Sequence, residues 1–150
     1  MDAVYIGLGS NMGNRLEQLQ KAVRSLRKII SNLRAAPVYE TAPQLFEQQD
    51  YFLNTVVSGC TSMSPPQLLI ELQAIEKTQG REREKSRRYG PRTIDLDILL
   101  SGKLCQTWNL DNNRTLTVPH ERMHERLFVL QPLLDLNPQL TDPRDNVPWS

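Results

Sequence analysis

The chain has 150 residues, 39% of them hydrophobic, which is enough to bury the core of one globular domain, and we expect residues 1–150 to form a single domain. Its 18 basic and 17 acidic residues leave a net charge of +1, so nothing in the overall balance indicates nucleic acid or an anionic membrane as a partner. With no signal-peptide pattern, no apolar run long enough to span a bilayer and only two cysteines, we expect a cytoplasmic protein.

The first half of the chain alternates between strand-like and helix-like patterns. Residues 3–9 form a short apolar run of the kind found in buried strands. Beyond Asn14, with Glu17 three residues later as in a helix cap, apolar residues recur at spacings of three and four and predict an amphipathic helix. The apolar positions of this helix are Leu16, Leu19, Val23, Leu26 and Ile30. The next segments are expected to be a strand, a long loop and a third strand, at 33–40, 41–52 and 53–60.

A second helix is expected to begin at Ser64, because a serine cap, two prolines in the first turn and Gln67 at the capping-box position all favour helix initiation. Gly80 is expected to end this helix. Its core-facing residues are Leu68, Leu69, Leu72 and Ile75. The later segments are a basic stretch, a strand, a hairpin and an apolar run that adds to the core, at 81–92, 93–100, 101–117 and 127–136.

This order of elements predicts the fold class. The order βαββαβ, followed by a C-terminal extension, is typical of an α+β ferredoxin-like sandwich, in which helices pack on an antiparallel sheet. Such a fold by itself says nothing about function, so the function has to be sought in particular side chains.

Two aspartates, Asp95 and Asp97, interrupt the apolar strand expected at 93–100. Alternate residues of a strand share one face, so both carboxylates are expected on one face together with Leu99. The opposite face is expected to carry Ile94, Leu96, Ile98 and Leu100. Carboxylates on residues about 6.5–7 Å apart repel one another unless a divalent cation lies between them, and Mg²⁺ suits such a pair together with substrate phosphates. The alternative is a strand with one solvated face.

A basic segment precedes the two aspartates and favours the metal-binding interpretation over the solvated face. Its only acidic residues are Glu82 and Glu84. Its basic residues are more numerous and are Arg81, Arg83, Lys85, Arg87, Arg88 and Arg92. Arginine binds phosphate oxygens in a bidentate manner, and metal ions neutralise the remaining charge. A solvated loop is the alternative for the basic segment alone, but together with Asp95 and Asp97 it indicates a polyphosphate site.

Three glycines lie between the first strand and the first helix, where a dinucleotide-binding loop would be found. The spacing of Gly7, Gly9 and Gly13 is one residue too long for that motif. We expect these glycines to form a tight strand-to-helix turn instead.

Residues 120–124, HERMH, match the zinc-protease motif H-E-x-x-H and raise the hypothesis of a zinc hydrolase. Pro119 precedes the motif, which would place it in the first turns of a helix, and the chain has no further histidine to act as a third ligand. We interpret the match as coincidence, with His120 remaining a candidate hydrogen-bond donor to a phosphate.

Two aromatic residues and one amide suggest a site for a flat ligand. A heteroaromatic ring could lie between Phe52 and Phe128 and be recognised by the carboxamide of Asn54, which offers both donors and acceptors. From periodicity alone, however, the stronger interpretation is that Phe52 and Phe128 are core residues.

Several segments resemble, in the same order along the chain, the 6-hydroxymethyl-7,8-dihydropterin pyrophosphokinases of folate biosynthesis. The longest is RYGPRTIDLDIL at 88–99. The others are GLGSNMGNR near the start, YET and a proline in 39–43, FLN at 52–54, the IE and QGR of 75–81, and TVPHERMHERLFVLQPL at 117–133. The resemblance therefore extends over most of the chain, and its signature is long and specific.

The resemblance implies transfer of pyrophosphate from ATP to the hydroxymethyl oxygen of the pterin, with release of AMP and with two Mg²⁺ ions as cofactors. It implies metal ligands at Asp95 and Asp97 and catalytic arginines at Arg81, Arg83 and Arg92. Contacts to ATP are implied for Glu76, Arg88, Ile98, His120 and Arg126. Contacts to the pterin are implied for Thr41, Ala42, Phe52, Asn54 and Phe128. We expect a monomer whose partners are these two small molecules.

The order βαββαβ also occurs in RNA-recognition domains, and a ferredoxin-like RNA-binding module without turnover is the alternative function. Against it, no strand carries the aromatic motif of those domains, and the net charge is near zero.

Overall fold

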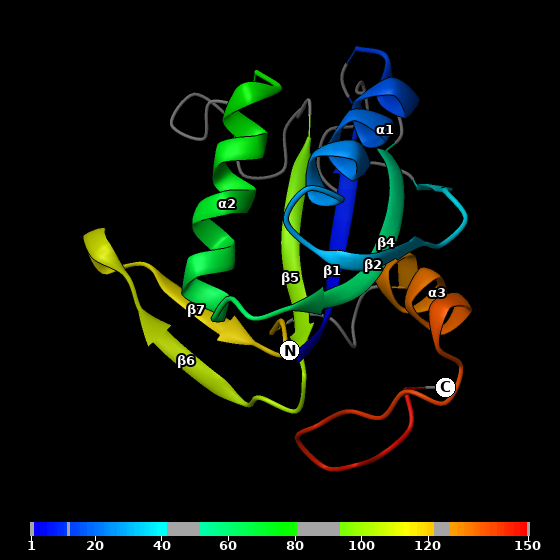
Figure 1. Cartoon of the computed structure of the whole chain (residues 1–150). Coiled ribbons are helices and arrows are strands. Elements are labelled where there is room, and N and C mark those ends of the chain that lie inside the picture. The colour runs from blue at the N-terminus through cyan, green and yellow to red at the C-terminus, as the bar shows by residue number, and fades with distance from the viewer. Residues whose placement is uncertain (1, 12, 42–51, 81–93, 122–126, 150) are drawn as a thin grey trace.

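A computed structural model describes the whole chain except residues 1, 12, 42–51, 81–93, 122–126 and 150 (Figure 1). Its elements are, in chain order, β1 (Asp2–Ser10), α1 (Arg15–Leu26), β2 (Ser31–Ala35), β3 (Tyr39–Thr41), β4 (Phe52–Thr61), α2 (Pro65–Thr78), β5 (Asp95–Ser101), β6 (Gln106–Asn109), a short 3₁₀ helix (Asp111–Asn113), β7 (Thr115–Val118) and α3 (Leu127–Leu136).

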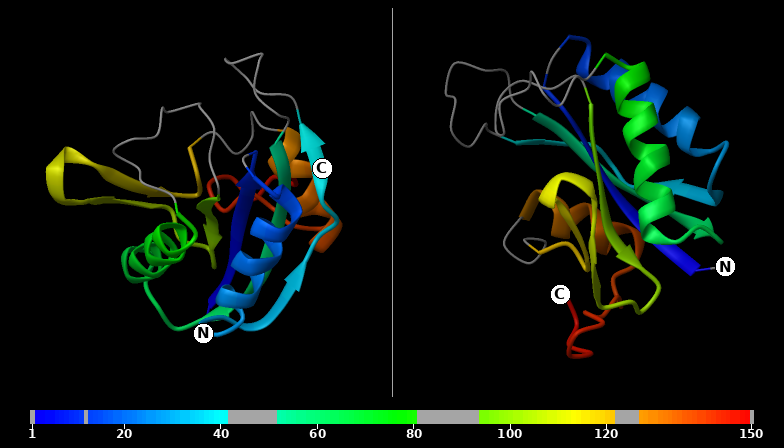
Figure 2. Two further views of the ribbon diagram at one scale, coloured as in Figure 1. Left: turned by 90° about the horizontal axis from the view of Figure 1, so that it is seen from above. Right: turned by 90° about the vertical axis from the view of Figure 1, so that its left-hand side faces the viewer.

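One antiparallel sheet organises these elements. Its strands lie in the order β2, β4, β1, β5, and β3 pairs with a further stretch of β4. Helices α1 and α2 cover one face of the sheet and α3 covers the other (Figures 1 and 2). β6 and β7 form a separate hairpin, as predicted for 101–117. The predicted ferredoxin-like α+β sandwich is therefore confirmed, and α3 belongs to the C-terminal extension.

The strand predicted at 33–40 is in fact two strands, β2 and β3, separated by residues 36–38. Pro37 has no N–H to donate to a ladder, which interrupts the pairing with β4. The hydroxyl of Thr55 holds the gap against β4, since it lies 2.9 Å from the carbonyl oxygen of Ala36 and 3.2 Å from that of Pro37. Both halves therefore stay on the same edge of the sheet.

Both predicted helix starts are confirmed. The side chain of Asn14 accepts the backbone N–H of Glu17 at 3.1 Å, which caps α1. Ser64 and Gln67 form a reciprocal capping box at α2, with donor–acceptor distances of 3.0 and 3.4 Å. The helix ends as expected before Gly80, whose φ of +93° is a conformation that glycine adopts without strain.

The buried stripe of α1 differs from the prediction at one end. Leu19, Ala22 and Leu26 are buried, whereas Leu16 is 47% exposed. Leu16 lies about 90° around the helix from the centre of that stripe, at 100° per residue, so Ala22 completes it instead. Ile30 is buried as expected, but it lies beyond the last residue of α1.

Two apolar clusters lie on the two faces of the sheet. The cluster under α1 and α2 includes Ile94, Leu96 and Ile98, as predicted from alternation. Leu100 was predicted on the same face, but it packs with Leu99 in the cluster under α3. The reason is a β-bulge: in the pairing with β1, the register shifts between Tyr5 and Ile6, which leaves Leu99 as an extra residue and turns Leu100 to the α3 face.

Candidate active site

Two glycines in β1 lie at the centre of the candidate site. Tyr5, Gly7 and Gly9 alternate along β1 and therefore face the α3 side, while the residues between them face α1 and α2. Gly7 and Gly9 lie inside β1, which confirms the strand predicted at 3–9, so the strand-to-helix turn predicted for the same two glycines is wrong. Only Gly13, with a φ of +68°, lies in the turn before α1.

The neighbouring strands place polar residues on both sides of these glycines. In the antiparallel register, Gly9 is opposite Asp95 of β5 and Asn54 of β4, and Gly7 is opposite Asp97. Residues directly opposite one another share a face of the sheet. The carboxylate pair and the amide are therefore brought together across β1, on the α3 face.

The side chains of Asn54 and Phe52 lie close to the Cα atom of Gly9. A Cβ atom on Gly9 would be 2.9 Å from Oδ1 of Asn54 and 3.7 Å from Cδ1 of Phe52. Asn54 is buried, with 7% exposure, and Phe52 is half-buried. An amide and an aromatic ring side by side suit a flat, hydrogen-bonding ligand, so we expect a slot for such a ligand beside Asn54 and Phe52.

Asp95 and Asp97 have the arrangement expected of a magnesium-binding pair. They are half-buried and lie on one face of β5, which is the outer strand of the sheet order. In the part of the chain that the structure describes, no third His, Cys, Asp or Glu joins them in a metal-binding group. Two carboxylates suit Mg²⁺, because proteins usually bind this ion through one or two carboxylates. Waters and substrate phosphates supply the rest of its coordination.

Glu76 supports this strand from the other side. Its side chain is 1% exposed, and Oε2 accepts the backbone N–H of Leu96 at 2.9 Å. Leu96 lies between Asp95 and Asp97, so the carboxylate on α2 holds the stretch of backbone that carries the pair. A buried carboxylate needs such donors, because an unpaired charge in the core would be strongly destabilising.

His120 and Ile98 lie next to the aspartates in different ways. The backbone N–H of His120 donates to the carbonyl oxygen of Leu99 at 3.0 Å, which brings His120 against β5. Ile98 is 3% exposed and packs in the cluster under α1 and α2. A contact between Ile98 and a nucleotide would therefore have to use its backbone.

Of the remaining predicted residues, the structure describes the backbone of some and does not describe the others. Thr41 is the last residue of β3 and pairs with Phe52. The ion pair between Arg15 and Glu40, at 3.1 Å, joins this end of β3 to the start of α1. Phe128 belongs to α3, although the position of its side chain is not described. The predictions that lie outside the described residues concern Ala42, Arg81, Arg83, Arg88, Arg92, His124 and Arg126.

Two features of the site were missed in the sequence. The position of Gly7 and Gly9 in the site could have been found from their spacing, because they have the period of two of a strand and alternate with the apolar residues Ile6 and Leu8. The contact of Glu76 with Leu96 had no local signal, because it joins two elements that are separated in sequence.

The fold and this face define a class of α+β sandwich that carries paired carboxylates beside a slot for a flat ligand. Residues 5–138 match the family described as 7,8-dihydro-6-hydroxymethylpterin-pyrophosphokinase, and the chain belongs to this family. The family predicted from the sequence motifs is thereby confirmed.

Known relatives agree with this assignment. A 2-amino-4-hydroxy-6-hydroxymethyldihydropteridine pyrophosphokinase of Bacillus subtilis is 45% identical over 140 residues, covering 91% of this chain and 78% of that protein. A folic acid synthesis protein of Pneumocystis carinii is 43% identical over 143 residues, covering 95% of this chain. A crystal structure of a HPPK-DHPS triple mutant from Plasmodium falciparum has a TM-score of 0.80 at 16% identity, covering 99% of this chain, and shows the likeness in fold.

The chain matches only one part of some of these relatives. It spans 18% of the Pneumocystis protein and 42% of the Plasmodium chain. What those longer proteins do as a whole is therefore not transferred to this chain.

Proposed function

We propose that the protein is an ATP:6-hydroxymethyl-7,8-dihydropterin pyrophosphotransferase of folate biosynthesis. The observation that carries the proposal is the row formed by Asn54, Gly9 and Asp95, in which a slot for a flat ring adjoins a carboxylate pair on one sheet face. An enzyme that joins a pterin to a pyrophosphoryl group needs these two sites to be adjacent. Membership of the pyrophosphokinase family supports the same reaction.

The pterin would lie in the slot expected beside Asn54 and Phe52. Phe52 supplies an aromatic surface on one side, and Phe128 of α3 is proposed to supply the other. The carboxamide of Asn54 recognises the ring edge, because an amide can both donate and accept hydrogen bonds. Thr41 and Ala42, at the end of β3 and just beyond it, are proposed to complete the recognition of the ring.

ATP would bind over β5, with its polyphosphate next to Asp95 and Asp97. These two residues would hold two Mg²⁺ ions, which neutralise phosphate charge when bound. Glu76 keeps the backbone between them in place through Leu96. His120, whose backbone is bonded to Leu99, would donate to a phosphate oxygen. Further phosphate and nucleotide contacts are proposed for Arg81, Arg83, Arg88, Arg92, Ile98 and Arg126.

The transfer is a displacement at the β-phosphorus of ATP. A bond forms between the hydroxymethyl oxygen and the β-phosphorus, and the bond from that phosphorus to the oxygen bridging it to the α-phosphorus breaks. AMP leaves with the bridging oxygen, and the hydroxyl proton passes to water. The protein contributes alignment and a fixed array of charge, which dominate catalysis of phosphoryl transfer.

We further propose that the protein acts as a single-domain monomer in the cytoplasm, with ATP and the pterin as its partners. Its two cysteines, Cys60 and Cys105, are both free thiols, which a reducing compartment favours. Within the described ranges, no helix is both long and apolar enough to cross a membrane.

A product assay tests the proposed reaction. The protein is incubated with MgCl₂, ATP and 6-hydroxymethyl-7,8-dihydropterin, and the nucleotides are separated by chromatography. AMP formed in equal amount to a diphosphorylated pterin, and only when the pterin is present, is the expected result. ADP as the product would place the attack on the γ-phosphorus, and absence of turnover would contradict the proposal.

A further inference from the structure

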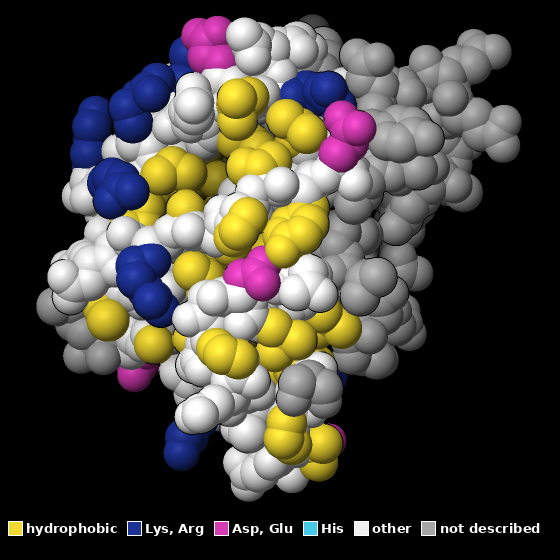
Figure 3. All heavy atoms as spheres, turned by 90° about the vertical axis from the view of Figure 1, so that its right-hand side faces the viewer, with side chains coloured by type: hydrophobic (Ala, Val, Ile, Leu, Met, Phe, Trp, Pro, Cys, Tyr) yellow, Lys and Arg dark blue, Asp and Glu magenta, His cyan; other side chains and the backbone are white. Residues whose placement is uncertain are grey.

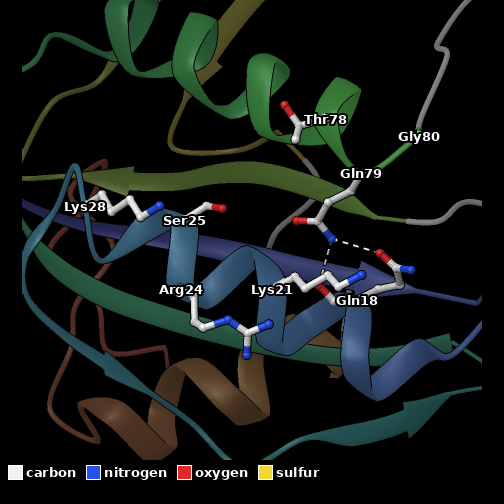
Figure 4. A pocket seen from close by; sticks show the side chains of 8 residues that line it. All are labelled: Gln18, Lys21, Arg24, Ser25, Lys28, Thr78, Gln79 and Gly80. Carbon is white, nitrogen blue, oxygen red and sulfur yellow. Dashed lines mark hydrogen bonds between the residues drawn. The ribbon is translucent and has the colours of Figure 1, made fainter.

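A groove of about 670 Å³ lies between α1 and the end of α2, among the helices on the sheet face opposite to Asp95 and Asp97. Neither the pterin slot nor the carboxylate pair contributes to its lining. Its walls come from α1 and the turn after it on one side, and from the last residues of α2 with Gly80 on the other (Figure 4). The described lining of the groove therefore shares no residue with the described part of the candidate active site.

Positive side chains line the α1 wall of this groove. Lys21, Arg24 and Lys28 have spacings of three and four, which places them on one side of the helix and the turn that follows it. Lys21 is 3.4 Å from Glu17, an exposed pair that neutralises little at the surface. Among the residues that the structure describes, the side chains of Arg24 and Lys28 make no hydrogen bond or ion pair. Lys and Arg side chains gather along the left margin of Figure 3, the side on which α1 and α2 lie.

The described residues of the opposite wall offer these cations no carboxylate. The residues of α2 and its end that line the groove are Thr78, Gln79 and Gly80, all uncharged. If the cations served only to join the two helices, cross-helix ion pairs would be expected at this place. The link is made by Gln79 instead: its Nε2 donates to the backbone oxygen of Gln18 at 2.9 Å and to Oε1 of Gln18 at 3.0 Å (Figure 4). Within the described part of the chain, Lys21 thus has a counter-charge only at its exposed pair with Glu17, and Arg24 and Lys28 have none.

We propose that this groove binds a small polyanion, a molecule that carries two or three phosphate groups. A cleft lined by charges of one sign concentrates ions of the opposite sign, and arginine matches phosphate geometry with its planar fork. Sites for small molecules usually measure about 300–1,000 Å³, a range that includes this groove. A macromolecular polyanion is disfavoured, because it needs a long basic track, whereas the whole chain has a net charge of only +1.

The test uses inorganic pyrophosphate as the probe, in buffer without a divalent metal, and NMR spectra of the ¹⁵N-labelled full chain. The side-chain amide signals of Gln18 and Gln79 report on the groove, and the backbone signals of residues 95–98 report separately on the active site. We expect saturable shifts of the groove signals. In the double variant Arg24→Gln/Lys28→Gln, the affinity should fall at least about tenfold, a difference of about 1.4 kcal/mol.

The matched control removes the same charge elsewhere. Lys103 and Arg114 are exposed and lie at the turn before β6 and beside the β6–β7 hairpin, so Lys103→Gln/Arg114→Gln should bind pyrophosphate as the unmodified protein does. If Arg24→Gln/Lys28→Gln does not fold, Lys28→Gln alone replaces it, because Lys28 lies beyond the last residue of α1. The proposal is overturned if the groove signals stay in place, if their shifts do not saturate, or if both double variants lose affinity equally. None of these outcomes depends on pterin turnover, so this proposal and the proposed function can fail separately.

Discussion

Oδ1 of Asn54 lies 2.9 Å from the point where a Cβ atom of Gly9 would be, so the amide proposed to recognise the pterin occupies space that only glycine leaves open. Gly9 is in β1 and Asn54 is directly opposite in β4. The position of the amide is therefore set by a residue that itself offers the ligand no side chain.

Replacing Gly9 by alanine should damage pterin binding selectively. The new methyl group would displace the carboxamide of Asn54, whose contact of 2.9 Å is closer than a Cβ atom tolerates. We expect the KM for the pterin to rise by about tenfold or more, since misplacing a binding group by about 1 Å is commonly that costly, while the KM for ATP changes less. Steady-state kinetics with each substrate varied in turn measures both constants.

Gly7→Ala is the matched control for this variant. Gly7 lies two residues earlier on the same face of β1, but a Cβ atom there would be 3.5 Å from the side chain of Leu99, an ordinary contact. Its KM for the pterin should remain near that of the unmodified protein. Equal increases in the two variants would mean that this part of β1 as a whole, rather than the contact with Asn54, decides the affinity.

Replacing Asp97 by asparagine should remove magnesium-dependent turnover without unfolding the protein. The substitution keeps the shape of the side chain but halves the negative charge of the pair. We expect kcat to fall by about 10²-fold or more, because a metal site that stabilises transferring phosphates contributes several kcal/mol. AMP production over a range of MgCl₂ concentrations measures the loss, and circular dichroism checks the fold. Asp111→Asn, at an exposed position in the 3₁₀ helix, should leave turnover unchanged.

Truncating Glu76 should destabilise the protein as well as the site. Glu76→Ala leaves the N–H of Leu96 without its acceptor and opens a cavity beside β5, so the free energy of unfolding should fall by about 2–4 kcal/mol. Glu76→Gln keeps an oxygen that can accept from Leu96 and should lose less than half of that amount. Urea denaturation followed by circular dichroism gives both values. Equal stability of the two variants would show that the acceptor at this place contributes nothing.

Tyr39 links stability to pH at the alkaline end. Its hydroxyl donates to Oδ2 of Asp135 on α3. This hydrogen bond, then burial and the negative charge of Asp135, raise the pKa of Tyr39 above its ordinary value of 10.0. Folding therefore favours the protonated phenol: its contribution is complete below pH 10.0 and is lost as the pH rises through the folded-state pKa.

The variant Tyr39→Phe isolates this contribution. The difference in unfolding free energy between the unmodified protein and Tyr39→Phe should be constant from pH 7 to about pH 9 and should shrink above about pH 10. Urea denaturation of both proteins across this range measures the difference. A difference that grows above pH 10 would mean that the phenolate, not the phenol, is the favoured form.

Local chemistry made part of this structure predictable. The caps at Asn14 and Ser64 depend on residues three positions apart, and both were identified from the sequence. The one strand expected at 33–40 is divided at Pro37. This division could have been predicted from the sequence, because proline has no N–H to donate to a strand ladder. In the site, the sequence placed Asp95 and Asp97 on one strand face correctly, because alternation along a strand is also a local rule.

Other features depend on how distant strands are aligned. Leu100 lies on the α3 face instead of the predicted face, because the register between β5 and β1 shifts at a bulge. No pattern within β5 indicates this bulge. The same kind of alignment puts Gly9 between Asn54 and Asp95, and the packing of α2 on β5 brings Glu76 to Leu96.

By itself, then, the sequence determined the family and the order of most elements and supplied the predicted site residues, because motifs, caps and alternation depend on near neighbours in the chain. Only the tertiary structure decided that Gly7 and Gly9 lie between the carboxylates and Asn54, which face of the sheet these side chains share, and how Glu76 supports the backbone that carries the carboxylates. Pairing register and helix packing bring together residues far apart in sequence, and they are set by the simultaneous burial of both faces of the sheet.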